Sequence, residues 1–269
     1  MRIADVAEAV ARRDRWVVGG LLALVVLLAW AYTLSGVGMH DMDATSMGMT
    51  PAEHEAMMRR LSWTPGYALL MFAMWWIMMA AMMVPSVAPM VLLFATISRK
   101  DPDTGALVAP TGAFLSGYLL AWAAFSALAT LLQWALERAG LVSPMAMSAG
   151  AVLGGGLLVA AGLYQLTPLK QACLAKCRNP VLFLMQEWRA GASGALRMGA
   201  EHGAWCLGCC WFLMALLFVG GVMNVLWIAA LAVYVYIEKL APHGHWLSYA
   251  TGAALTAAGL GMWAYALGA

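Results

Sequence analysis

The sequence predicts an all-α membrane protein, a single domain over residues 1–269 built as a polytopic bundle of about seven transmembrane helices. Of its 269 residues, 64% are hydrophobic and only 10% are charged, whereas a water-soluble domain carries about 25% charged residues. Several uninterrupted apolar runs reach the ~20 residues that a helix needs to cross the hydrocarbon layer. Lipid offers no water to backbone groups, so these runs must be helical.

Seven apolar segments account for the predicted spans. They are residues 16–35, 67–97, 109–136, 146–169, 203–220, 222–240 and 246–267. The fifth and sixth join through Gly220-Gly221, which we expect to form a tight turn. The first span follows a basic start and is long enough to remain as an anchor; its cleavage as a signal peptide would leave six spans.

The charges predict a cytoplasmic N-terminus and an outer C-terminus. In this orientation twelve of the fifteen Lys and Arg residues face the cytoplasm, as the positive-inside rule requires. Residues 1–15 and a cysteine-containing loop at 170–202 then lie in the cytoplasm, and a Met/His-rich loop at 36–66 lies outside. We therefore expect a multi-pass protein of the bacterial inner membrane, with the lipid bilayer as its surroundings. No basic cluster with interleaved aromatic residues indicates a nucleic-acid partner.

The outer loop carries soft metal ligands. Met39, His40 and Met42 lie close together, and six Met residues fall within twenty positions of this loop. Imidazole and thioether groups suit copper, and thioether favours Cu(I). The segment is therefore predicted to capture that ion, the alternative being a polar linker that happens to contain Met.

The second span continues the enrichment in methionine. Met78/Met82 and Met79/Met83 are M-x-x-x-M pairs one helical turn apart, which can converge on one ion if they face the bundle interior. The alternative is ordinary packing, because Met fills gaps in apolar cores. Pro85 and Pro89 are expected to kink or interrupt this span.

The cysteines form the clearest candidate site. His202, Cys206 and Cys209/Cys210 fall at positions i, i+4 and i+7/i+8 and therefore share one face of a helix. Three thiols and an imidazole on one stripe predict a soft-metal site. Disulfides are disfavoured in the reducing cytoplasm, although free Cys is also a common small buried residue.

A second pair of cysteines, Cys173 and Cys177, follows the fourth span as C-x-x-x-C and is a further candidate for metal binding. Glu238 and Lys239 end the sixth span, where we expect them to pair or to extend to the interface. Glycines at 154–156, 252, 259 and 261 are expected to mark close contacts between helices.

Three segments together resemble a bacterial family of predicted metal-binding integral membrane proteins, a family without a characterised activity. They are Ala-Ala-Met-Met-Val-Pro at 80–85, Tyr-Gln-Leu-Thr-Pro-Leu-Lys at 164–170 and Cys-Leu-Gly-Cys-Cys-Trp at 206–211. With their flanking residues these segments cover most of the chain from the second to the sixth span. The resemblance implies metal binding and supplies no further function.

These observations favour a protein that handles Cu(I), by transport or by delivery, together with metal carriers in the periplasm and the cytoplasm. One alternative is a membrane thiol–disulfide relay, which leaves the methionines unexplained. Another is a non-catalytic subunit of an oligomer or a larger membrane complex. The sequence has no Ser-His-Asp set, no H-E-x-x-H zinc motif and no phosphate-binding loop, so it does not favour an enzyme.

Overall fold

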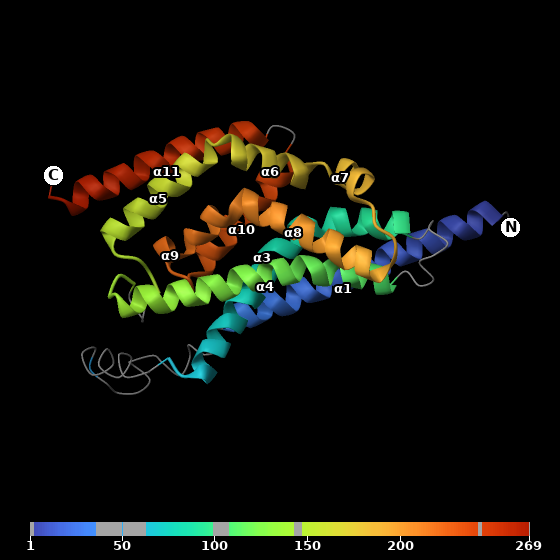
Figure 1. Cartoon of the computed structure of the whole chain (residues 1–269), viewed down its shortest axis with the longest axis horizontal. Helices are drawn as coiled ribbons and strands as arrows, with labels where there is room; N and C mark the ends of the chain where they lie inside the picture. The colour runs from blue at the N-terminus through green and yellow to red at the C-terminus, as the bar shows by residue number, and fades with distance from the viewer. Residues whose placement is uncertain are drawn as a thin grey trace.

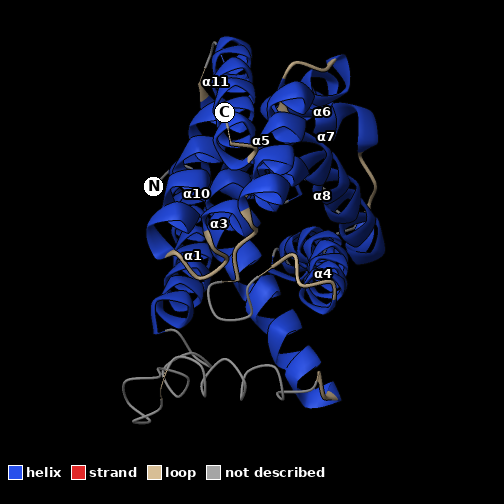
Figure 2. Ribbon diagram, turned by 90° about the vertical axis from the view of Figure 1, so that its left-hand side faces the viewer, coloured by secondary structure: helices blue, strands red, loops and turns tan. Residues whose placement is uncertain are grey.

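The computed structural model describes residues 3–35, 50, 63–98, 108–142, 147–241 and 244–268, and this part of the chain is almost entirely helical (Figures 1 and 2). Four long helices are α1 (Ile3–Ser35), α3 (Pro65–Ser98), α4 (Val108–Arg138) and α8 (Gly191–Ala215). The others are α5 (Ala151–Gln165), α6 (Pro168–Arg178), α7 (Pro180–Glu187), α9 (Leu217–Gly220), α10 (Val225–Leu240) and α11 (Gly244–Ala266). The prediction of an all-α fold is confirmed.

Several helices are suited to crossing a membrane. Within the described residues, the stretches Trp16–Ser35, Pro65–Ser98, Pro110–Arg138 and Gly191–Gly220 are long and apolar enough, and α5 with α6 adds a fifth if the bent pair is one span. Helix α10 has 16 residues, or about 24 Å, which is short for a hydrocarbon layer of ~30 Å. The predicted count of seven spans is therefore not confirmed.

Large apolar side chains lie on the outer surface of the described residues, and a charged pair lies inside. Leu27 and Leu128 on the outer surface are 66% and 64% exposed, whereas Lys170 and Glu238 are fully buried. Water-soluble proteins bury such charged residues almost only as pairs, and they seldom expose many large apolar side chains together. Ionisable residues in membrane bundles, by contrast, face the interior.

Glycine sets the distance between two pairs of helices. Helices α5 and α11 lie side by side (Figure 1), and a Cβ on Gly155 or Gly259 would come within 3.1 Å of the other residue's carbonyl oxygen. Helices α4 and α8 approach as closely, because a Cβ on Gly199 would lie 1.9 Å from the carbonyl oxygen of Phe114. The expected glycine contacts are thus present, although Gly261 faces open space.

The break between α5 and α6 follows from local chemistry. Pro168 opens α6, where its missing N–H costs nothing, and Thr167 caps the helix by accepting from the Lys170 backbone N–H at 3.3 Å. The two helices meet at an angle of 67°. The bend turns α6 across α8 and so brings Cys173 and Cys177 toward the bundle interior.

The structure differs from two expectations about local structure. Residues 170–202, expected to be a loop, form α6, α7 and the start of α8. Helix α8 begins at Gly191, and Arg197 and Glu201 pair along its first turns at 2.9 Å. Helix α3 runs through Pro85 and Pro89 without interruption. At Gly220-Gly221 the expected turn is present, since α9 ends there and Gly221 has a φ of 91°, a conformation that favours glycine.

The contact between α4 and α8 yields a test of stability. We expect Gly199→Ala to lower the free energy of unfolding by about 1–3 kcal/mol, because the added methyl group would push two helix backbones apart. The measurement is thermal unfolding in detergent micelles. Gly112→Ala in α4 is the matched control, since a Cβ there meets no atom within 4 Å. Equal melting temperatures for the two variants would contradict the role given to Gly199.

Candidate metal centre

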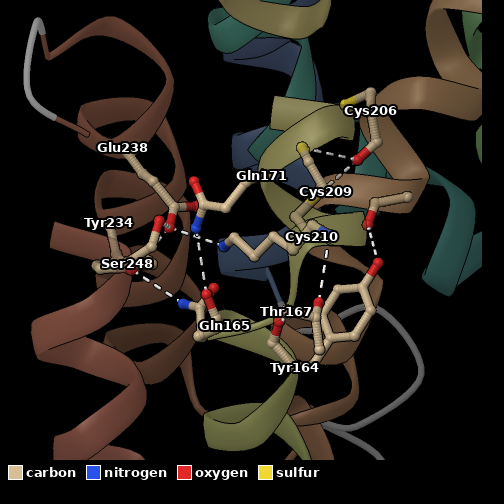
Figure 3. A network of polar contacts seen from close by, with 12 residues as sticks. Tyr164, Gln165, Thr167, Gln171, Cys206, Cys209, Cys210, Tyr234, Glu238 and Ser248 are labelled. Atoms are coloured by element: carbon tan, nitrogen blue, oxygen red, sulfur yellow. Dashed lines mark hydrogen bonds and ion pairs between the residues drawn. The ribbon is translucent and has the colours of Figure 1, made fainter. Parts of the chain in front are cut away.

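Helix α8 presents four potential ligands to the bundle interior. His202, Cys206, Cys209 and Cys210 are all buried, with exposed fractions of 3%, 1%, 0% and 1%. Figure 3 shows the three cysteines close together on this helix. The spacing in the sequence therefore predicts correctly that they share one buried face.

Cys206 has the most polar contacts of the three cysteines. Its Sγ accepts a hydrogen bond from Lys239 Nζ on α10 at 2.9 Å and lies 3.1 Å from the hydroxyl of Tyr118 on α4. An ammonium group so close to sulfur stabilises the thiolate form, which is the form that binds metal. Three helices thus meet at this sulfur atom.

The other two thiols on α8 turn back toward their own helix. Cys209 Sγ donates to the Cys206 carbonyl oxygen at 3.1 Å, and Cys210 Sγ donates to the same oxygen at 2.9 Å (Figure 3). Within the described residues, no group of three or more His, Cys, Asp or Glu side chains is arranged to hold a metal ion. Coordination would require these thiols to rotate away from the carbonyl oxygen toward Cys206 Sγ.

Helix α6 brings the remaining cysteines to the same place. The Cys177 thiol lies within interaction range of the thiols of Cys206 and Cys209. Cys173 Sγ packs on Gly208, where an added Cβ would lie 2.7 Å from the sulfur atom. Gly208 in the Cys-Leu-Gly-Cys-Cys motif therefore allows α6 to approach α8.

Helix α3 contributes a thioether. Met78, Met79, Met82 and Met83 are all buried, so both M-x-x-x-M pairs lie within the bundle. Met83 Sδ lies 3.9 Å from Lys239 Nζ, on the same ammonium group that contacts Cys206. Met83 therefore belongs to the group of side chains around Cys206, here called the Cys206 cluster: Cys177, Cys206, Cys209, Cys210, Met83 and Lys239. Met78, Met79 and Met82 remain predicted ligands in the packed interior.

His202 lies one helical turn from Cys206, among aromatic rings. Its ring centroid is 5.1 Å from that of Phe183 and 6.1 Å from that of Tyr118. Its Nδ1 atom has no hydrogen-bond partner within the described part of the chain. Because buried polar nitrogens are nearly always paired, an unpaired ring nitrogen here is consistent with a ligand position.

The cluster lies deep within the long helices. Cys206 is about 22 Å from the start of the stretch Gly191–Gly220 and about 21 Å from its end. Met83 is likewise roughly 27 Å and 22 Å from the two ends of α3. Because α8 begins earlier than the predicted fifth span, Cys206 lies at the middle of the stretch Gly191–Gly220 and not near one end.

A second polar network flanks the cysteines (Figure 3). Glu238 Oε1 accepts from Lys170 Nζ at 2.7 Å, from the Tyr234 hydroxyl at 2.9 Å and from the Ser248 hydroxyl at 2.7 Å. Lys170 and Glu238 are both fully buried. The network joins α6, α10 and α11 and fixes the rotation of α10 about its own axis.

The sequence did not identify Lys239 or Tyr118 as part of the site. The expected pairing of Glu238 with Lys239, or their extension to the interface, is wrong, because Glu238 pairs with Lys170 and Lys239 lies among the sulfur atoms. Residues i and i+1 point about 100° apart on a helix and do not face each other. The adjacent charges Glu238 and Lys239 in an otherwise apolar helix could have indicated this, because neighbouring residues face different sides of a helix and so need different partners.

Met39, His40 and Met42 lie outside the described residues, so their metal binding stays a prediction. The other predicted ligands supply thiolate, thioether and imidazole groups in a buried setting with no carboxylate among them. This donor set fits a soft, singly charged ion such as Cu(I) and suits Mg²⁺ or Ca²⁺ poorly. The residues present therefore fit copper as a cargo.

Fold and site together define a helical protein with a sulfur-rich centre, which lies midway along its long helices. A family model described as PpoB2, copper chaperone, matches residues 72–262, well over half of the chain, so the chain belongs to this family. The match includes every cysteine, Met83 and Lys239 and leaves out Met39, His40 and Met42. No curated protein and no solved structure matches the chain. The expected relation to copper is thus borne out at the level of the family.

The buried ion pair next to the site gives a second prediction. Lys170→Met should lower the free energy of unfolding by about 3–5 kcal/mol, because it leaves the Glu238 carboxylate buried without a cation. The double substitution Lys170→Met/Glu238→Gln removes both charges and should cost much less. Chemical or thermal unfolding in detergent measures both. An equal loss of stability in the two variants would show that the charge of Glu238 is not the cause.

Proposed function

We propose that the protein is an integral membrane copper chaperone that binds Cu(I) at the Cys206 cluster and exchanges the ion with carrier proteins. One observation carries the proposal: cysteines from α6 and α8 converge with Met83 of α3 inside the bundle. Thiols and a thioether gathered at one place supply the soft donors that Cu(I) prefers. The match to a copper chaperone family over the same residues supports it.

The membrane location is part of the proposal. Exposed leucines outside, buried charges inside and four long apolar helices support a bundle within a lipid bilayer. The distribution of Lys and Arg favours the bacterial inner membrane with the N-terminus in the cytoplasm. In this setting a site at mid-depth is reached from either side only through the bundle.

The methionines supply a route to the cluster. Met71, Met74, Met78 and Met82 occupy successive turns of α3, and all four are buried within the bundle. Thioethers bind Cu(I) weakly and exchange it readily, which suits a relay better than a storage site. Met39, His40 and Met42 would collect the ion at the outer end, and carriers on the two sides would supply and receive it.

The test is the amount of Cu(I) bound by the full chain in detergent, loaded under reductant and counted by elemental analysis. We expect about one Cu(I) per wild-type chain and a drop to background in Cys206→Ser, because the sulfur atom contacted by three helices is lost. Met198→Leu is the matched control: it removes a buried sulfur atom from α8 about 12 Å along the helix from Cys206 and should leave the stoichiometry unchanged.

Equal copper content in Cys206→Ser and wild type would reject the site. Absence of copper from the wild type, together with disulfide formation between Cys177 and Cys206 or Cys209 on mild oxidation, would favour the thiol–disulfide relay. Absence of both, with loss of co-purifying proteins in the variant, would favour the subunit of a larger complex.

A further inference from the structure

The ammonium group of Lys239 lies among the proposed ligands. Nζ donates to Cys206 Sγ at 2.9 Å, to Ser86 Oγ at 3.1 Å and to Met83 Sδ at 3.9 Å. A lysine ammonium has three N–H donors, and these three contacts use all of them. Since the residue is only 6% exposed, its positive charge is fixed within the cluster.

No carboxylate neutralises this charge in the described part of the chain. The adjacent Glu238 points to the other side of α10, where Oε1 already accepts from Lys170, Tyr234 and Ser248. The titratable groups that face Lys239 are Tyr118 on α4 and the cysteines of α8. Of the three groups that Nζ contacts directly, Cys206, Ser86 and Met83, only the thiol of Cys206 readily forms an anion.

The charge of a bound ion then depends on its ligands. When two cysteines bind Cu(I), two Cu–S bonds form, and any proton still on either sulfur atom leaves for the buffer. Copper stays Cu(I), so no electron is transferred. Two thiolates and one Cu(I) carry a single negative charge, and the ammonium of Lys239 makes the whole site neutral. Without that ammonium, an uncompensated charge would be buried in an apolar bundle.

We propose that Lys239 is the counter-ion of a copper–dithiolate centre and thereby determines which ligands hold the ion. The inference rests on the proposed function and names its coordination: Cys206 with one neighbouring thiolate, Cys177, Cys209 or Cys210. If Lys239 lacked its charge, the neutral alternative would be one thiolate with the thioether of Met83. Lys239 is thus a positioning residue that acts through the ligands.

The experiment compares the Cu(I) affinity of the full chain in detergent by competition with a chromophoric Cu(I) chelator. Lys239→Met keeps the apolar length of the side chain and should weaken binding by roughly tenfold or more, because the anionic centre loses its nearest cation. Lys239→Arg, which keeps the charge, should restore most of the affinity. Arg138→Met, which removes an exposed positive charge at the end of α4, is the matched control and should leave the affinity unchanged.

A double-mutant cycle gives a readout that a merely structural role would not move. Met83→Leu should lower Cu(I) affinity several-fold more in Lys239→Met, where Met83 replaces a thiolate, than it does in the wild type. If Lys239→Met does not fold, Lys239→Gln takes its place in the same cycle.

The outcomes separate this inference from the function on which it rests. Equal affinity for wild type and Lys239→Met would overturn the counter-ion role and leave copper binding intact. Tighter binding in Lys239→Met would also overturn it, since the ammonium would then be a competitor of the ion. No binding by the wild type would overturn both proposals.

Discussion

The interior of this protein is organised around a buried positive charge, that of Lys239. An ion taken out of water into an apolar bundle is costly unless hydrogen-bond acceptors surround it. Here the acceptors are Cys206 on α8 and Met83 and Ser86 on α3. The site therefore needs α3, α8 and α10 in fixed positions. The second buried pair, Lys170 with Glu238, holds α10 from its other side.

Close backbone packing makes these positions possible. Gly199 allows α4 to contact α8, which places Tyr118 beside Cys206, and Gly208 allows α6 to bring Cys177 to the same point. In the membrane location that we propose, lipid would supply no hydrophobic drive between helices, so such contacts between small residues would contribute much of the free energy of their association. The same glycines that hold the bundle together thus assemble the sulfur cluster.

Local periodicity was enough to predict part of this arrangement. The shared face of His202, Cys206, Cys209 and Cys210 follows from 3.6 residues per turn, and the structure buries all four. The approach of Cys177 to Cys206 depends on the bend at Thr167-Pro168 and on tertiary packing, which spacing does not encode. Lys239 was missed because a charge near a helix end was interpreted as an interfacial one.

Hydropathy did not predict where α8 begins. The start of α8 carries Arg197 and Glu201, so a search for apolar runs begins the span about twelve residues too late. These two charges pair along the helix, which is compatible with helical structure in this segment. This shift matters for function, because it moves Cys206 from the end of a span to its middle.

The most direct test of the account is a structure of the full chain loaded with Ag(I), a redox-inert substitute for Cu(I). The account predicts one strong metal peak beside Cys206 Sγ, bonded to a second cysteine sulfur, with Lys239 Nζ still close to the cluster. A peak elsewhere on the molecule, with Cys206 still bound only to Lys239 and Tyr118, would contradict it.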